Sequence, residues 1–137
     1  MSLNKPIQIL LVSSSKFFLN GIHKVLEDKC NLKVVAKVSN GEEVEECFNE
    51  TKPDFLFLDN RSALMDLNTL LNLITKKSPY TKVILLANQN EEKLNFPNVI
   101  YITKKTDSSK LRQIIERKRL RRLVSTIRSN RVNVKKR

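Results

Sequence analysis

The chain has 137 residues, of which 40% are hydrophobic and 29% charged, as is typical of one globular domain with its own apolar core. No apolar run is long enough to span a bilayer, and the run from Ile7 to Val12 is too short for a signal peptide, so we expect a cytoplasmic protein with no membrane partner. Cys30 and Cys47 are therefore expected to be reduced thiols. With one histidine and no CxxC motif, the chain offers no zinc site.

The whole chain has a net charge of +12, and this positive charge is concentrated in its last quarter. Residues 1–103 contain 12 Lys and Arg against 12 Asp and Glu, so this part is neutral. Residues 104–137 contain 14 Lys and Arg against two acidic residues, which accounts for the whole +12. A basic amphipathic segment of this kind is typical of surfaces that bind nucleic acid, an anionic membrane or an acidic partner helix, and a basic face that is simply solvated stays open as the alternative.

Short apolar segments alternate with helical patterns along the chain. Strands are predicted at residues 8–12, 33–38, 54–58, 83–86 and 99–102, because each is a short apolar run bounded by polar or turn-forming residues. Apolar residues at helical spacing predict helices after the first three strands, and Asn40 with Glu43 marks the start of the second helix. Residues 88–98 leave room for one or two helical turns, so a fourth helix there is expected to be shortened or missing. This alternation predicts an α/β fold with a parallel sheet covered on both faces.

Polar or small residues follow the predicted strands where functional residues gather in open α/β sheets. They are Ser13 and Ser14 after the first strand, Asp59 after the third, Ala87 after the fourth and Lys104 after the fifth. With the stretch from Val34 to Glu43 and Lys52-Pro53-Asp54, this pattern resembles the receiver domain of two-component response regulators, over about residues 7–116. The resemblance, nearest to receivers of helix-turn-helix transcription regulators, implies a flavodoxin-like (CheY-like) fold with a five-stranded parallel sheet of order 2-1-3-4-5.

The resemblance also implies a phosphoryl-transfer site. Receivers accept a phosphoryl group on an aspartate, with Mg²⁺ held by that aspartate and an acidic pair, a stabilising lysine, and a hydroxyl that registers the phosphate. Asp59 matches the acceptor and Lys104 the lysine, but Ser13 and Ser14 replace the acidic pair and Ala87 replaces the hydroxyl. We therefore expect a vestigial acceptor, no metal, no cofactor, no enzymatic activity and no dependence on a cognate histidine kinase.

Other interpretations of these residues, most of them purely structural, stay open. Asp59 can be a retained carboxylate paired with Lys104, or a conventional phosphoacceptor. Lys104 can be a strand-end lysine with its ammonium in water. The run from Ser13 to Ser15 can be a polar turn that caps the first helix.

The last helix carries two apolar stripes. At about 100° per residue, Leu111, Ile114 and Ile115 share one face, and a second group lies nearly opposite. That second group consists of Leu120, Leu123, Val124 and Ile127. Either the helix breaks near residues 117–119, or it runs past the domain and offers the second stripe to another chain, which we favour. We accordingly divide the chain into a receiver-like domain (1–116) and a basic helical extension (117–137).

Three functional hypotheses follow. The first is an atypical response regulator that works without phosphorylation, as a module for homodimerisation or for binding an output protein through the C-terminal helix, in gene regulation. The second is binding to DNA or other nucleic acid by the basic helix. Its candidate residues are Arg117, Lys118, Arg119, Arg121, Arg122 and Arg128. The third is a conventional receiver phosphorylated on Asp59.

Overall fold

The computed structural model describes residues 6–30, 32–59, 66–86, 96, 98–103, 106 and 108–135. Its elements, in chain order, are β1 (Ile7–Val12), α1 (Lys16–Cys30), β2 (Leu32–Val38), α2 (Gly41–Glu50), β3 (Phe55–Asp59), α3 (Leu67–Lys77), β4 (Lys82–Leu86), β5 (Val99–Ile102) and α4 (Ser108–Lys135). The five strands form one sheet of order β2-β1-β3-β4-β5, and every neighbouring pair is parallel. The predicted fold and strand order are confirmed. The predicted strand ends were wrong by one residue at several places, β3 for example running from Phe55 to Asp59.

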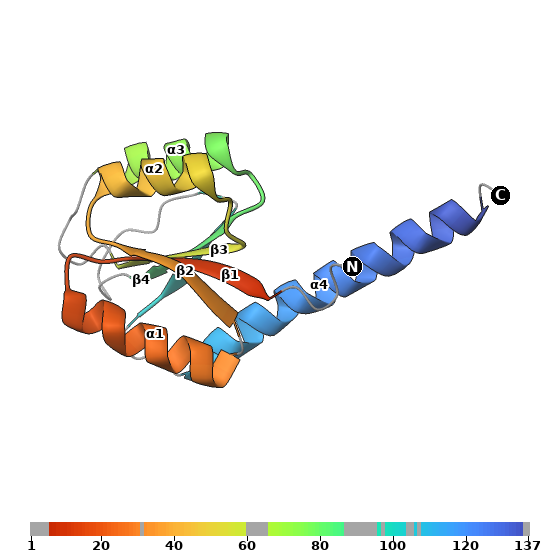
Figure 1. The fold of residues 1–137 in the computed structure, drawn as a ribbon, viewed down its shortest axis with the longest axis horizontal. Coiled ribbons are helices and arrows are strands. Elements are labelled where there is room, and N and C mark those ends of the chain that lie inside the picture. Colours follow the sequence, from red (N-terminus) through yellow and green to blue (C-terminus); the bar gives the residue numbers. More distant parts are fainter. Residues whose placement is uncertain are drawn as a thin grey trace.

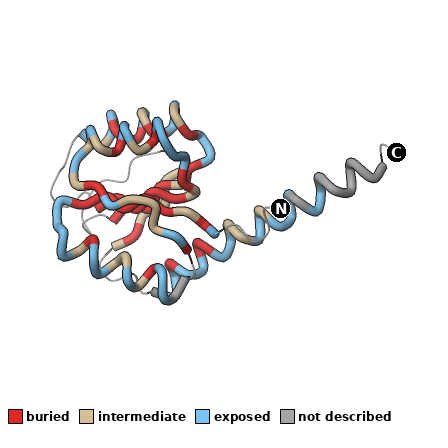
Figure 2. The backbone as a smooth tube through the Cα atoms, in the orientation of Figure 1, coloured by how far each residue is buried: buried red, intermediate tan, exposed pale blue. Residues whose placement is uncertain are grey.

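The sheet is covered by helices on both faces, with α2 and α3 on one side and α1 and the first part of α4 on the other (Figure 1). Successive strand residues point to opposite faces, so Leu11 and Phe57 pack towards α1 and α4. Leu10 and Leu56 pack towards α2 and α3. This explains why the central strands β1, β3 and β4 are nearly continuous apolar runs: in a parallel sheet covered on both sides their side chains are buried on both faces, whereas the edge strands β2 and β5 are only partly buried (Figure 2).

Local hydrogen bonds set the starts of the first three helices. The Ser15 hydroxyl accepts from the Phe18 backbone N–H (3.1 Å), which caps α1. The Asn40 side chain accepts from the Glu43 N–H (3.0 Å), and the Glu43 carboxylate accepts from the Ser39 N–H (3.1 Å). Asp66, which the sequence pattern did not single out, accepts from the Thr69 N–H and caps α3. The predicted start of α2 at Asn40 is confirmed.

Helix α4 does not break near residues 117–119; it runs without interruption from Ser108 to Lys135 and extends away from the domain (Figure 1). Leu111, Ile114 and Ile115 are buried against the sheet and α1. Lys118, four residues after Ile114, lies on the same helix face and donates to the backbone carbonyl of Tyr80 (3.4 Å). The predicted shortening or loss of a helix within residues 88–98 falls almost entirely outside the described residues, which include only positions 96 and 98 of this stretch.

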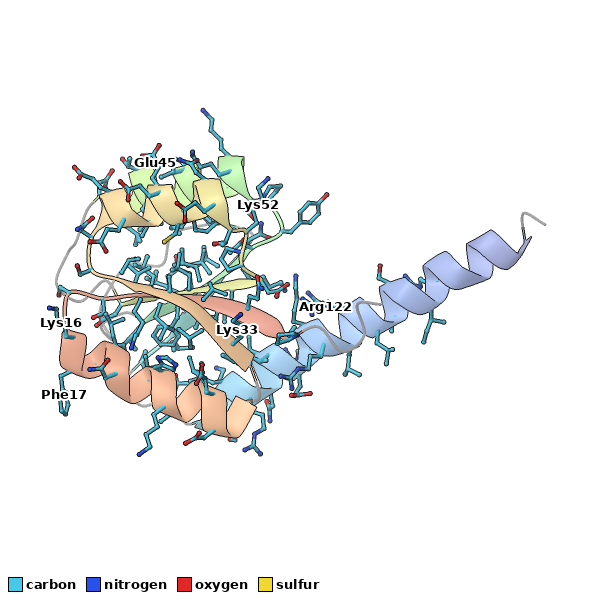
Figure 3. The ribbon with its side chains drawn as sticks, viewed as in Figure 1. Lys16, Phe17, Lys33, Glu45, Lys52 and Arg122 are labelled. Carbon is cyan, nitrogen blue, oxygen red and sulfur yellow. The ribbon has the colours of Figure 1, made fainter. Side chains whose placement is uncertain are left out.

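A partly buried ion pair holds α4 against the domain at the point where the helix leaves it. Arg122 Nη2 donates to Asp54 Oδ1 (2.6 Å), at the amino ends of the strands, which we call the base of the sheet (Figure 3). Asp54 Oδ2 accepts from the Gln8 backbone N–H (2.9 Å), and the Asp54 backbone N–H donates to the Gln8 carbonyl. Asp54 therefore joins β1, β3 and α4 at one point.

Breaking this ion pair is expected to destabilise the domain. The side chains of Arg122 and Asp54 are only 22% and 19% exposed, so their charge-assisted hydrogen bond is poorly replaced by water. We predict that Arg122→Ala lowers the free energy of unfolding in urea by about 1–3 kcal/mol, whereas Arg128→Ala, at an exposed position on the same helix, leaves it unchanged. Additive losses from Arg122→Ala and Asp54→Ala in a double-mutant cycle would contradict the pairing.

Candidate functional site

The register of β1 and β3 brings Ser13 beside Asp59 at the carboxyl ends of the strands. Val12 is the partner of Leu58, so the next residues of the two strands, Ser13 and Asp59, lie opposite each other. Both continue the alternation of Leu11 and Phe57, so their side chains lie on the same face of the sheet. The two positions that sequence analysis placed in a phosphoacceptor site are thus brought together.

Ser13 and Asp59 are joined by a buried hydrogen bond. The Ser13 hydroxyl donates to Asp59 Oδ2 at 2.8 Å, and the two residues are 0% and 4% exposed. The hydroxyl oxygen in turn accepts from the Ser15 backbone N–H (3.1 Å), which orients the hydroxyl proton towards the carboxylate. The Ser13 backbone N–H donates to the Val38 carbonyl, so the residue is also held by β2.

Ser14 and Ser15 have different positions from Ser13. Ser14 is exposed, and Ser15 caps α1. The interpretation of the serine run as a helix-capping turn is therefore correct for Ser15, whereas Ser13 binds the carboxylate of Asp59. Ala87 and Lys104 lie outside the described residues, and so does any pairing of Lys104 with Asp59.

The side chains described at this edge of the sheet do not match the ligand set for Mg²⁺ that the resemblance implies. Mg²⁺ selects hard, negatively charged oxygen ligands, and here Ser13 and Ser14 present neutral hydroxyls where carboxylates would stand. No cluster of three or more His, Cys, Asp or Glu residues suited to a metal ion occurs in the part of the chain that the structure describes. Among the described residues that end the strands, the carboxylate is that of Asp59, which already accepts the hydroxyl proton of Ser13.

Three of the six basic residues proposed for nucleic acid contact other groups of the chain. Lys118 binds the Tyr80 carbonyl, Arg119 pairs with Glu116 one turn earlier, and Arg122 pairs with Asp54. Arg117, Arg121 and Arg128 are exposed. Counting charges in the sequence could not separate these two groups, because the Asp54 partner of Arg122 lies 68 residues away.

Cations also gather at the base of the sheet beside α4. Lys82, at the start of β4, is partly buried, and this burial is the largest cause lowering its pKa. The positive charges of Arg121, Lys118 and Arg117 lower the pKa of Lys82 further. The base of the sheet and the first exposed turns of α4 therefore form one basic surface, at the opposite end of the strands from Asp59.

The sequence matches a known family over most of its length. A family model described as "Response regulator receiver domain" matches residues 9–116. The chain belongs to this family. Receiver domains are the signal-receiving units of two-component systems, and the five-stranded parallel sheet described above is the architecture of its structural neighbours.

Curated relatives of this receiver domain include larger enzymes. The chain is 32% identical over 73 residues to a protein-glutamate methylesterase/protein-glutamine glutaminase of Idiomarina loihiensis, covering 53% of the chain and 19% of the relative. It is 30% identical over 89 residues to the protein of the same name from Thermotoga maritima, covering 65% of the chain and 26% of the relative. The chain thus spans about a quarter or less of the length of these two relatives.

Solved structures show the same fold. The response regulator domain of Thermotoga maritima CheB superposes with a TM-score of 0.61 at 26% identity, covering 91% of this chain and 96% of that one. A two-component transcriptional regulator AraC from Clostridium phytofermentans superposes with a TM-score of 0.72 at 20% identity, covering 89% and 98%. None of the helices in the described residues combines the length and apolar composition needed to cross a lipid bilayer.

Removing the Ser13 hydroxyl is expected to destabilise this receiver domain. Ser13→Ala deletes a buried hydrogen bond to a carboxylate and leaves the Ser15 N–H without its acceptor, so we predict a loss of about 1–3 kcal/mol in the free energy of unfolding. Ser14→Ala, the same substitution at the exposed neighbour, should change it by less than about 0.5 kcal/mol. Equal effects of the two substitutions in urea denaturation would show that the Ser13 bond contributes nothing.

Proposed function

We propose that this receiver domain acts without magnesium-assisted phosphorylation of Asp59, as a protein-interaction module that presents helix α4. The observation that carries the proposal is the buried hydrogen bond from Ser13 to Asp59 Oδ2. In a working acceptor site that oxygen must be free to bind a metal or attack phosphorus. Here a neutral hydroxyl engages it where the family has an acidic residue.

The electrostatics of phosphoryl transfer support this proposal. A carboxylate and an incoming phosphoryl donor repel each other, and a divalent cation offsets this repulsion by binding both. With Ser13 and Ser14 in place of the acidic pair, the ligand charge that attracts a hard dication falls by two units. Ala87 in the sequence further removes the hydroxyl that would respond to an Asp59 phosphate.

The position of α4 supports an output through that helix. The Asp54–Arg122 ion pair and the Lys118–Tyr80 contact hold the helix where it leaves the domain. Beyond that point its apolar residues Leu120, Leu123, Val124 and Ile127 are exposed. A rigidly held helix with an uncovered apolar stripe is typical of a surface that another chain binds.

Phosphorylation can be tested directly. We expect the intact mass of the chain to stay unchanged after incubation with acetyl phosphate and MgCl₂. The gain of one phosphoryl group, abolished in Asp59→Asn, would overturn the proposal and establish a conventional receiver.

A charge-restoring variant provides the matched comparison. In Ser13→Asp/Ser14→Asp, the new carboxylate at the buried position 13 lies beside the buried Asp59, and the two repel each other until a dication binds. The carboxylate added at the exposed position 14 supplies a further ligand charge, so this variant should be destabilised in EDTA and stabilised by Mg²⁺. At a hundredfold excess of Mg²⁺ over its Kd the stabilisation is about 2.7 kcal/mol. Ser13→Asn/Ser14→Asn, similar in size but uncharged, should show no response to Mg²⁺, like the unsubstituted chain. Thermal denaturation with and without Mg²⁺ measures all three, and a Mg²⁺ response in the unsubstituted chain would contradict the proposal.

Nucleic acid binding by α4 is a second candidate, favoured by the exposed residues Arg117, Arg121 and Arg128 and the adjoining basic surface at Lys82. Each phosphate contact contributes about 0.9 to the slope of log affinity against log salt concentration. Replacing these three arginines by Gln should therefore lower the slope by about 2.7 for duplex DNA, measured by fluorescence anisotropy.

A control with the same change in charge separates a specific surface from general attraction. Lys16, Lys24 and Lys52 are exposed and lie outside α4, and replacing them by Gln removes the same three charges. If both triple variants weaken DNA binding equally, α4 is not the binding surface.

A further inference from the structure

The outer face of α4 carries an apolar stripe that its own domain cannot cover. Leu120, Leu123, Val124 and Ile127, the outer stripe, are 60%, 40%, 44% and 49% exposed. At about 100° per residue they fall within an arc of about 100°. The opposite face of the helix holds the residues that contact the domain, from Leu111 to Arg122. The helix is continuous and extends away from the domain (Figure 1). Since its opposite face contacts the domain, helical geometry places the outer stripe on the side that faces away from the sheet.

Positive charge borders the outer stripe. Arg117, Arg121 and Arg128 are exposed and lie along one side of it, at helix angles of about 70–110° from its centre. Arg119 lies on the other side and pairs with Glu116. Between positions 117 and 128 the sequence contains six Lys and Arg and no acidic residue. A partner of the outer stripe must therefore bury apolar side chains while its edges face arginines.

A second copy of this chain does not meet both requirements. Pairing two outer stripes would bring the arginine borders of both helices together, and like charges along the edges of a helix pair oppose association. The acidic helix α2, which contains Glu42, Glu43, Glu45, Glu46 and Glu50, complements the charge. Its apolar residues Val44 and Phe48, however, are buried against its own sheet and cannot cover the stripe.

Nucleic acid and lipid meet the requirements less well than a helix. Phosphates can pair with Arg117, Arg121 and Arg128 but leave the apolar stripe in water. A lipid surface can take both, yet interfacial helices usually carry Trp or Phe on the apolar face, and α4 contains no aromatic residue. The outer stripe spans positions 120–127, about 10 Å along the helix, a length that two turns of a partner helix can cover.

We propose that the outer stripe of α4 binds an amphipathic helix of another protein, whose apolar face is bordered by Asp and Glu. This inference rests on the proposed function, in which α4 is the output surface. The apolar side chains supply the association, and the acidic borders select the partner over a second copy of this chain. The Asp54–Arg122 ion pair keeps the receiving helix in place before the partner arrives.

Two synthetic helical peptides test the proposal with the full chain. Both carry leucine at heptad a and d positions; one has Glu at the flanking e and g positions and the other has Lys. We expect the Glu peptide to bind by isothermal titration calorimetry and the Lys peptide not to bind. Between 0.1 and 1 M NaCl the screening length falls from about 10 to about 3 Å, so binding of the Glu peptide should weaken by about tenfold.

Variants at exposed positions locate the binding surface without disturbing the core. Leu120→Gln/Leu123→Gln should abolish binding of the Glu peptide, and Arg117→Gln/Arg121→Gln/Arg128→Gln should weaken it and reduce its salt dependence. Phe17 is 92% exposed on α1 and points away from the domain at the end opposite Arg122 (Figure 3). Phe17→Gln is therefore the matched control and should bind the peptide like the unsubstituted chain.

The contrary outcomes are distinct. Equal binding of both peptides, or binding of neither, overturns the acidic-helix partner. A dimer in analytical ultracentrifugation that Leu120→Gln/Leu123→Gln dissociates assigns the stripe to a second copy. Binding to anionic vesicles or duplex DNA that this variant abolishes assigns it to lipid or nucleic acid. A phosphoryl gain at Asp59 overturns the proposed function, whereas an unphosphorylated chain that binds neither peptide overturns only this inference.

Discussion

The pairing of β1 with β3 positions both ends of this domain. At the carboxyl ends of the strands the register places Ser13 opposite Asp59, and the serine hydroxyl donates to the buried carboxylate. At the base, the same pair of strands joins Gln8 to Asp54, whose second carboxylate oxygen accepts from Arg122 of α4. One strand, β3, is therefore bounded by two aspartates. One accepts a hydrogen bond from the neutral hydroxyl of Ser13 at the place where phosphoryl transfer occurs in the family, and the other binds Arg122 of the helix that leaves the domain.

The fold was predictable because its signals are local and redundant. A strand buried on both faces is apolar along its buried length, and the runs Ile9–Val12 and Phe55–Leu58 are typical of such strands in a parallel sheet. The helix start at Asn40 is equally local, since its side chain bonds a backbone group three residues away. Two of the one-residue errors at strand ends arose where polar residues take part in the ladder: Lys82 and Asp59 lie inside β4 and β3 although their side chains resemble loop residues. Two other strands, β1 and β2, begin one residue earlier than predicted, at the apolar Ile7 and Leu32.

The sequence predicted which residues lie at the site but did not predict which of them form hydrogen bonds with each other. The resemblance placed Ser13 and Asp59 at neighbouring strand ends, but the division of labour among Ser13, Ser14 and Ser15 depends on where the chain turns. The turn buries Ser13, exposes Ser14 and places Ser15 at the cap of α1. The contact between Asp54 and Arg122 could not be predicted either, because it also depends on the tertiary arrangement of the chain. Each residue looks like an ordinary surface charge until strand pairing and helix docking bring two groups 68 positions apart within hydrogen-bonding distance.

Helix α4 shows how a net charge can mislead when it is read without partners. The last quarter of the sequence carries the whole +12, which suggests a uniform basic surface. In the structure the helix has a side facing the domain, where Lys118 and Arg122 extend the apolar docking face with polar contacts, and an outer side with the exposed apolar stripe. The charges that remain exposed border that stripe.

The exposed face of α4 therefore combines an apolar stripe with bordering arginines, and is not a uniformly basic surface. Because the helix is already fixed at Asp54, binding there does not have to order it first, and less of the interaction free energy is lost to conformational entropy. A phosphorylation switch normally changes the population of two states of a receiver. The proposed function needs no such switch, because it has the Ser13 hydroxyl engaging Asp59 and α4 already held at Asp54. Under this proposal, the concentration of the partner and the sign of its charge would decide when α4 is occupied.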